Sequence, residues 1–166
     1  MAVYYDTKTG NVRNFIKKLL AMASNMIAIN INDINEGDVL LPGHLITYTT
    51  GSGSVPVTTP YFMERNFQSV LSISDSGNKN WGKNFSVSGD ILAERYALFL
   101  VHKFEMTGFE EDVNKVLKDI FQLKNVVAGS YKLNKKLING VKKVLCLSDS
   151  ISDLVKEPSK FQQPNS

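Results

Sequence analysis

Two hydrophobic periods alternate along most of the chain. Short apolar runs rich in β-branched and aromatic side chains are typical of strands, and they occupy residues 2–6, 26–31, 44–49, 68–75 and 98–106. Apolar residues at the spacing of one helical face predict helices over residues 11–23, 58–65, 84–97 and 108–123. Strands that alternate with helices predict an α/β protein, in which a five-stranded parallel sheet is covered by helices on both faces.

Three polar loops follow the first, third and fourth predicted strands, over residues 7–11, 49–54 and 76–82. Ligands of such sheets lie beyond the carboxyl ends of the strands, at the point where the strand order reverses. In a doubly wound sheet of order 2-1-3-4-5 these three strand ends are neighbours. The loops are therefore expected to converge on one binding site, which is a stronger indication than any single loop provides.

The first loop, Thr7-Lys8-Thr9-Gly10-Asn11, passes directly from a predicted strand into a predicted helix. The free N–H groups at the start of a helix suit a phosphate, and the hydroxyls, the asparagine amide and the glycine add donors and room for close approach. Taken alone, such a loop is more often an ordinary helix cap. The loop lacks the longer glycine-rich patterns of nucleotide P-loops and dinucleotide folds, so one phosphate, and hence a mononucleotide, is the expected ligand.

Aromatic side chains near the other two loops are candidates to stack on or shield a flat ring. Core packing explains Tyr48 and Phe85 slightly better than ring contact, whereas Trp81 stands within a polar loop, where core packing explains it less well. Gly51 and Gly53 either form an ordinary flexible turn or allow a peptide beside the ring to change its orientation.

Other chemistries find little support in the chain. Asp6 would suit the metal-binding acid of a phospho-acceptor receiver domain, but the third strand ends in Thr49-Thr50, with no acceptor aspartate. One cysteine excludes an internal disulfide and a cysteine metal cluster, and the two histidines belong to no metal-ligand spacing. No nucleophile–histidine pair or carboxylate pair competes as a catalytic constellation, so we expect neither catalytic nor metal-binding residues.

Two motifs carry a resemblance to a known family. The first loop resembles the phosphate loop of flavodoxins. The block Ser76-Gly77-Asn78-Lys79-Asn80-Trp81-Gly82, with Phe85 after it and Lys103-Phe104-Glu105-Met106-Thr107-Gly108 ahead of Asp112-Val113, is similar to the NrdI family, the flavodoxin-like proteins that serve class Ib ribonucleotide reductases. The resemblance covers roughly residues 2–121. It implies a flavodoxin-like doubly wound sheet of order 2-1-3-4-5, to which this chain adds a C-terminal extension.

The resemblance implies bound FMN and a task for it. A flavin-reducing partner would reduce the flavin, which would react with molecular oxygen and supply superoxide to the radical-generating small subunit of the reductase. That subunit is either of the di-manganese type or of the metal-free type with a modified tyrosine. The residues that we assign to FMN are Thr7, Lys8, Thr9, Gly10, Asn11, Val12, Tyr48, Thr49, Thr50, Gly51, Ser52, Gly53, Ser76, Gly77, Asn78, Asn80, Trp81, Gly82 and Phe85.

Two departures from the flavodoxin pattern affect the phosphate loop. Val12 stands where a threonine is usual, so Thr7, Thr9 and backbone amides are expected to hold the phosphate. Asp6 would repel a phosphate unless it turns away or caps a backbone amide, and we leave it out of the binding set.

Residues 49–54 and 76–85 contain no carboxylate, and such surroundings favour an anionic reduced flavin. We therefore expect the second electron to be added about as easily as the first.

The remaining expectations, on solubility, location and nucleic-acid binding, rest on composition and charge. The chain is 43% hydrophobic and 21% charged, as is typical of a soluble globular protein, and its apolar runs are too short for a transmembrane helix. No secretory signal follows Met1, so we expect a cytoplasmic protein without membrane attachment. The net charge of +3 arises from residues 124–166, which hold eight lysines but no arginine, a composition that does not favour nucleic-acid binding.

We expect an FMN-binding domain over residues 1–123 and a basic, partly helical extension over residues 124–166 with a frayed end. The extension either docks on an acidic patch of the partner, covers part of the domain or is solvated. An alternative hypothesis is that the protein is a general electron-transfer flavodoxin, and the acid-poor loops argue against it. A third hypothesis is a flavin-free interaction module that acts through its basic extension.

Overall fold

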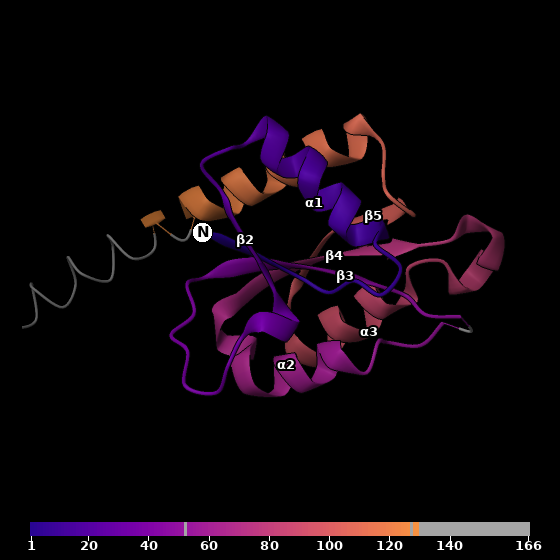
Figure 1. Ribbon diagram of the computed structural model, residues 1–166, viewed down its shortest axis with the longest axis horizontal. Helices are drawn as coiled ribbons and strands as arrows, with labels where there is room; N and C mark the ends of the chain where they lie inside the picture. Colours follow the sequence, from indigo (N-terminus) through magenta and orange to yellow (C-terminus); the bar gives the residue numbers. More distant parts are fainter. Residues whose placement is uncertain (52, 127, 130–166) are drawn as a thin grey trace, which may run out of the picture. The chain divides into compact units, whose positions relative to one another are not determined.

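The computed structural model describes residues 1–51, 53–126, 128 and 129. Its centre is a five-stranded parallel sheet of order β2-β1-β3-β4-β5, which confirms the predicted fold class and strand order (Figure 1). The strands are β1 (Ala2–Tyr5), β2 (Ile27–Asn30), β3 (Gly43–Tyr48), β4 (Val70–Gly77) and β5 (Phe99–Glu105).

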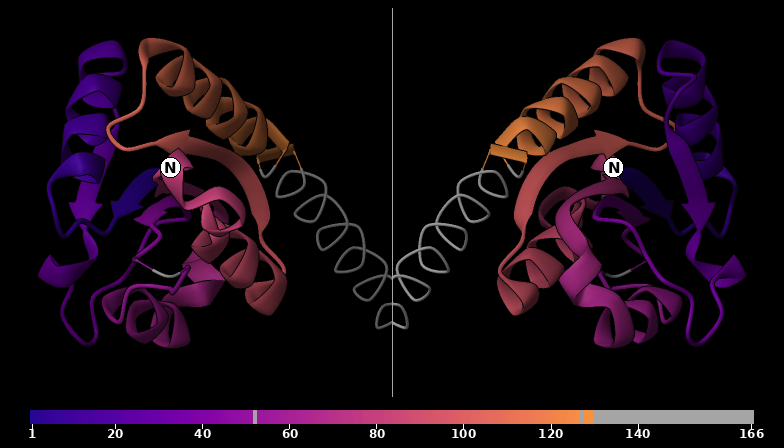
Figure 2. Two further views of the ribbon diagram at one scale, coloured as in Figure 1. Left: turned by 90° about the vertical axis from the view of Figure 1, so that its right-hand side faces the viewer. Right: turned by 90° about the vertical axis from the view of Figure 1, so that its left-hand side faces the viewer.

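Helices cover both faces of the sheet. The helix α1 (Asn11–Met22) and the helix over residues 110–126 lie on one face, and α2 (Thr58–Asn66) and α3 (Val87–Tyr96) lie on the other. The side views of Figure 2 show the same two layers. Three short 3₁₀ segments, Ile31–Asp33, Phe67–Ser69 and Lys79–Asn84, complete the described structure.

A separate apolar core lies on each face of the sheet. Val3 faces the core beneath α1, whereas its neighbours Ala2 and Tyr4 face the core beneath α2 and α3, because successive side chains of a strand point to opposite faces. In the first core the rings of Phe15 and Phe104 stack at a centroid distance of 4.0 Å. Burial on both faces explains the apolar run of β1, whereas β4 alternates and buries Ser72 and Ser74, whose hydroxyls bond to the His44 ring.

Some details differ from the sequence-based expectation. The loop expected over residues 76–82 is shorter, because Ser76 and Gly77 still pair as part of β4 and the segment after Asn78 forms a 3₁₀ turn. The helix expected over residues 84–97 is shorter, because α3 spans Val87–Tyr96, and its Ile91 is 41% exposed. The side of α3 that faces the sheet is formed by the small residues Ser88 and Gly89 together with Leu92, which turns Ile91 outward.

Residues Met1–Lys124 form one compact unit. The basic extension expected over residues 124–166 lies largely outside the described residues, so its boundary, its partial helicity and its frayed end stay predictions. In the part of the chain that the structure describes, no helix is both long enough and apolar enough to cross a membrane.

Candidate functional site

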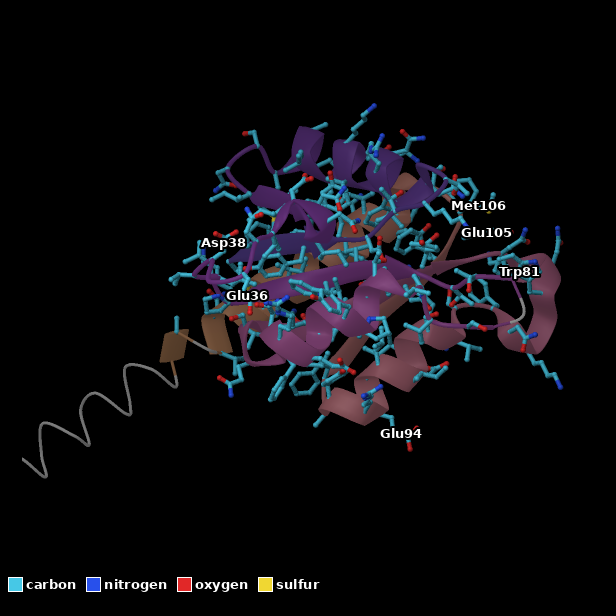
Figure 3. All side chains as sticks on the ribbon, turned by 60° about the horizontal axis from the view of Figure 1, so that its bottom comes forward. Glu36, Asp38, Trp81, Glu94, Glu105 and Met106 are labelled. Atoms are coloured by element: carbon cyan, nitrogen blue, oxygen red, sulfur yellow. The ribbon has the colours of Figure 1, made fainter. Side chains whose placement is uncertain are left out.

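The three predicted loops meet at one groove. The groove has a volume of about 310 Å³ and lies at the carboxyl ends of β1, β3 and β4. Figure 3 shows Trp81, Glu105 and Met106 at this same end of the sheet. The groove is lined by Thr7, Lys8, Thr9, Asn11, Val12, Tyr48, Thr49, Thr50, Gly51, Ser76, Gly77, Asn78, Trp81 and Met106.

The first wall of the groove is the turn from β1 into α1. Gly10 precedes the helix with φ 89°, a left-handed conformation that favours glycine, and no side chain caps the helix. The first intrahelical bond runs from Asn14 N to Gly10 O at 2.9 Å, so the N–H groups before Asn14 are free for a ligand. The ordinary helix cap that this loop offered as an alternative is therefore not formed by any of its side chains.

Thr7 contributes an unsatisfied donor to this wall. Its Oγ1 is buried and has no hydrogen-bond partner among the described residues. A buried hydroxyl without a partner costs free energy, and an anion held by the neighbouring N–H groups would satisfy it. Lys8, whose side chain is exposed at the same turn, adds positive charge.

The Asp6 side chain points away from the groove. An anion could bind in the neighbouring turn only if this carboxylate were directed elsewhere. The buried Asp6 carboxylate accepts hydrogen bonds from Thr58 Oγ1 and from Thr59 Oγ1, the latter at 2.8 Å, at the start of α2. A carboxylate at a helix N-terminus is stabilised by the helix dipole. Burial, and after it the charge of Asp6, raise the pKa of Tyr48 above its ordinary value, so the Tyr48 phenol stays neutral.

The second wall is the loop that follows β3, residues 49–54. It closes on itself, because Thr50 N and Thr50 Oγ1 both donate to Ser54 O at 2.9 Å and Gly53 N donates to Thr50 O at 2.9 Å. Gly53 has φ 92° and does not line the groove, whereas Gly51 does. Ser52 lies outside the described residues.

The third wall joins the end of β4 to the turn after β5. Ser76 Oγ donates to Met106 O at 2.7 Å, and Met106 N donates to Gly77 O at 2.9 Å. A side chain on Gly77 would lie 2.6 Å from Ser86 N, so this position needs a glycine. The 3₁₀ turn that carries Trp81 begins where Asn78 accepts a bond from Asn80 N at 2.9 Å.

Met106 lines the groove and was not among the predicted site residues. It is 43% exposed, adopts φ 52°, and accepts a hydrogen bond on Sδ from the Asn11 amide at 3.7 Å. The Lys18 ammonium in α1 fastens the same turn by donating to Gly108 O at 2.6 Å and to Thr107 O at 3.2 Å. The signal that could have identified Met106 is its place directly after the fifth strand, at the same sheet edge as the three loops.

Some predicted site residues do not line the groove. Gly10 is the residue that precedes α1 and is absent from the lining. The ring of Phe85 contacts the position where a side chain on Gly77 would stand, with Cδ2 at 3.0 Å. The predicted residues outside the lining are Gly10, Gly53, Asn80, Gly82 and Phe85. Direct ligand contact by these residues stays a prediction.

The groove offers an anion positive charge and hydrogen-bond donors, without opposing carboxylates. No Asp or Glu is among the described residues that line it, and Lys8 is the charged side chain there. Tyr48, Trp81 and Met106 supply apolar surface. A phosphate at one end and a flat ring at the other fit this division of the lining.

Comparisons with known proteins identify the family. The family model described as "NrdI Flavodoxin like" matches residues 3–118. The chain belongs to this family. A protein NrdI of Bacillus licheniformis is 35% identical over 118 residues, which cover 71% of this chain and 86% of that protein. A protein NrdI of Macrococcus caseolyticus is 34% identical over 116 residues, which cover 69% and 84% of the two chains. The resemblance found in the sequence is thereby confirmed.

Solved structures support the same fold. A short-chain flavodoxin associated with a PDU bacterial microcompartment superposes with a TM-score of 0.60 at 19% identity, covering 75% of this chain and 96% of that one. Flavodoxin 1 of Bacillus cereus superposes with a TM-score of 0.54 at 21% identity, covering 70% and 91%. At these identities the likeness shows the fold alone. Membership of the NrdI family implies a flavoprotein tied to a ribonucleotide reductase.

Proposed function

We propose that this NrdI-family chain binds FMN in the groove and supplies superoxide to the radical-generating small subunit of a class Ib-like ribonucleotide reductase. The observation that carries the proposal is the convergence of three loops, one with free helix N–H groups and an unsatisfied Thr7 hydroxyl, on a groove that no carboxylate lines among the described residues. Family membership supports the connection to the reductase.

We assign the parts of FMN to parts of the groove from the residues that line them. The turn from β1 into α1 suits the phosphate, because its N–H groups and the Thr7 hydroxyl are free and Asp6 is directed to α2. The walls formed by residues 49–51 and 76–81 suit the ring, with Trp81 as a stacking side chain. The one phosphate site favours FMN over a dinucleotide.

Bound FMN would supply the transfer of one electron to molecular oxygen, which yields superoxide, after a flavin-reducing partner has provided the electrons. The protein residues position this chemistry rather than perform it. The Asn11 amide and the Met106 thioether close one side of the groove, and Tyr48 keeps a neutral phenol in its wall. Met106 is 43% exposed, so a partner that docks at this edge of the groove would contact it directly.

Reconstitution tests the proposal directly. The purified protein should carry a flavin that is released by denaturation and identified as FMN by its mass. The reduced protein, mixed with oxygen and a purified reductase small subunit, should then generate a protein radical detectable by electron paramagnetic resonance. Small subunits of the di-manganese and metal-free types form two arms of the experiment. Absence of flavin, or of radical in both arms, would contradict the proposal.

Redox potentials separate this function from that of a general electron-transfer flavodoxin, whose fold the solved structures share. Since no carboxylate lines the described part of the groove, negative charge on the reduced flavin meets no carboxylate in direct contact there. We expect the potentials of the two one-electron steps to lie close together. A spectroscopic redox titration checks this expectation, and widely separated potentials would favour the electron-transfer alternative.

Substitution of the first loop tests the phosphate site. Thr7→Val keeps the shape of the side chain and removes the hydroxyl that lacks a protein partner, and Thr9→Ala removes the second hydroxyl of the loop. Each change should lower FMN affinity about ten- to a hundredfold, the usual effect of losing a hydrogen bond to a charged group. Fluorescence titration measures it, with riboflavin as the control ligand.

Riboflavin has no phosphate, so its affinity should not change in either variant. Unchanged FMN affinity in both variants would show that the phosphate is held elsewhere. An equal loss for riboflavin and FMN would show that the variants act on the shape of the groove.

A further inference from the structure

A buried carboxyl group lies directly behind the groove. Asp75 is fully buried near the end of β4, one residue before Ser76, which lines the groove. Its Oδ2 accepts hydrogen bonds from Thr49 Oγ1 at 2.8 Å and from Gly89 N at 2.7 Å. Its Oδ1 has no hydrogen-bond partner in the described part of the chain. One oxygen is therefore fully used and the other is free to take a proton.

A chain of hydrogen bonds connects Asp75 to both ends of the loop over residues 49–54. At the first end, Thr49 donates to Asp75 and itself accepts a bond from Ser88 N at 3.0 Å. At the second end, Ser88 Oγ donates to Ser54 O at 3.1 Å. Ser54 O is also the atom on which the loop closes, through Thr50 N. The carboxylate thus holds the loop through Thr49 and through the first turn of α3.

Charges of both signs surround Asp75. Lys103 lies opposite it on β5 and forms an ion pair with Asp90 of α3, while β3 contributes the neutral Thr47 and Thr49. Burial raises the pKa of Asp75 to about 6, although the Gly89 amide, the Thr49 hydroxyl and Lys103 lower it; Asp90 raises it further. The group therefore changes its charge close to neutral pH.

Protonation weakens the hold on the loop. A carboxylate accepts hydrogen bonds roughly twice as strong as those of a neutral acceptor, so a protonated Asp75 binds Thr49 and Gly89 less tightly. The proton comes from solvent and is placed on the carboxyl, where Oδ1 has no competing donor among the described residues. An O–H bond of the hydronium donor breaks as this O–H bond forms, and no other covalent bond changes.

We propose that Asp75 is a positioning residue that holds the loop over residues 49–54 against the groove when ionised and releases it when protonated, so that flavin binding is coupled to proton release. The part of this inference that concerns the flavin rests on the proposed function. Asp75 itself does not line the groove, so it acts on the ligand through Thr49 and the loop.

The first test uses the protein without flavin. The NMR amide resonances of Thr50, Gly51 and Gly53 should titrate together with a midpoint near the Asp75 pKa of about 6. In Asp75→Asn this transition should be absent. Asp112→Asn is the matched control, because Asp112 is bonded to His102 and to Phe109 N, on the other face of the sheet, and it should keep the transition. Retention of the transition in Asp75→Asn would overturn the proposal.

The second test measures FMN affinity between pH 5 and 8. The ratio of wild-type to Asp75→Asn affinity cancels the titration of the FMN phosphate, which is common to both proteins. The ratio should fall about tenfold as the pH decreases from 7.5 to 5, as expected for loss of about one charge-assisted bond. A ratio that does not change with pH would overturn the coupling.

A second variant keeps the proposal falsifiable where Asp75→Asn does not fold. Thr49→Val removes the hydroxyl that joins Asp75 to the loop and leaves the carboxyl in place. Its loop amides should show a much smaller transition, and an undiminished transition would contradict the proposal. If the protein binds no FMN, the proposed function fails, and the amide titration still decides the role of Asp75.

Discussion

Phe15→Ala should destabilise the protein by about 3–5 kcal/mol, the range observed when a buried aromatic side chain is truncated. Phe15 is fully buried on α1 and stacks on Phe104 with an interplanar angle of 15°. The backbone of Gly108 packs so closely that a side chain there would lie 2.6 Å from the Phe15 ring. The cavity left by alanine would therefore be enclosed by a helix, a strand and a turn.

Urea denaturation measures this loss, and Phe109→Ala is the matched control. Phe109 undergoes the same chemical change but is 66% exposed, so its truncation should alter the free energy of unfolding by no more than about 0.5 kcal/mol. Similar effects of the two substitutions would show that the aromatic stack does not stabilise the fold. FMN affinity should fall in Phe15→Ala as well, because the turn into α1 forms the first wall of the groove.

Gly77→Ala should lower FMN affinity about ten- to a hundredfold while the protein still folds. The added methyl group would stand 2.6 Å from both the N and the Oγ of Ser86. Ser86 is buried in a left-handed conformation with φ 49°, and its Oγ donates to Asp75 O at 3.2 Å, so this backbone has no room to yield locally. Overpacking of this kind costs about 1–3 kcal/mol. The strain displaces the wall of the groove, so the cost appears as weaker FMN binding.

The control for Gly77→Ala is Gly129→Ala. Around Gly129 an added methyl group would meet open space, so the same substitution should leave FMN affinity unchanged. Isothermal calorimetry of the two variants provides the comparison. Affinity of Gly77→Ala within threefold of the wild type would mean that this part of the groove wall does not contact the flavin.

The sequence was sufficient to predict the sheet and the meeting of its loops. Strand and helix periods fix the order of the elements, and parallel strands bring their carboxyl ends to one edge, so the loops of Thr7, Thr49 and Ser76 had to be neighbours. The direction in which the Asp6 side chain points was harder to predict, because its hydrogen-bond partners Thr58 and Thr59 lie 52 and 53 residues away in the sequence.

Burial of individual side chains depends on partners that periodicity does not reveal. Asp75 ended a predicted strand, but its burial requires the close approach of Gly89, where a side chain would lie 2.8 Å from Asp75 Cβ. In the helix that begins at residue 110, Phe121 is 41% exposed, whereas its neighbour Ile120 is buried. Which of two adjacent apolar residues faces a core depends on how the helix is rotated against the sheet.

The turn that contains Met106 has a consequence for the order of events during synthesis. Its backbone bonds to Ser76 and Gly77, and Lys18 of α1 fastens it through Gly108, so the wall of the groove joins segments from both ends of the domain. A nascent chain that has not yet exposed residue 108 outside the ribosome has the phosphate loop but no complete groove. Flavin capture should therefore not precede release of β5 and of the turn that follows it, while the core beneath α1 still awaits Val113, Val116 and Ile120 of the next helix.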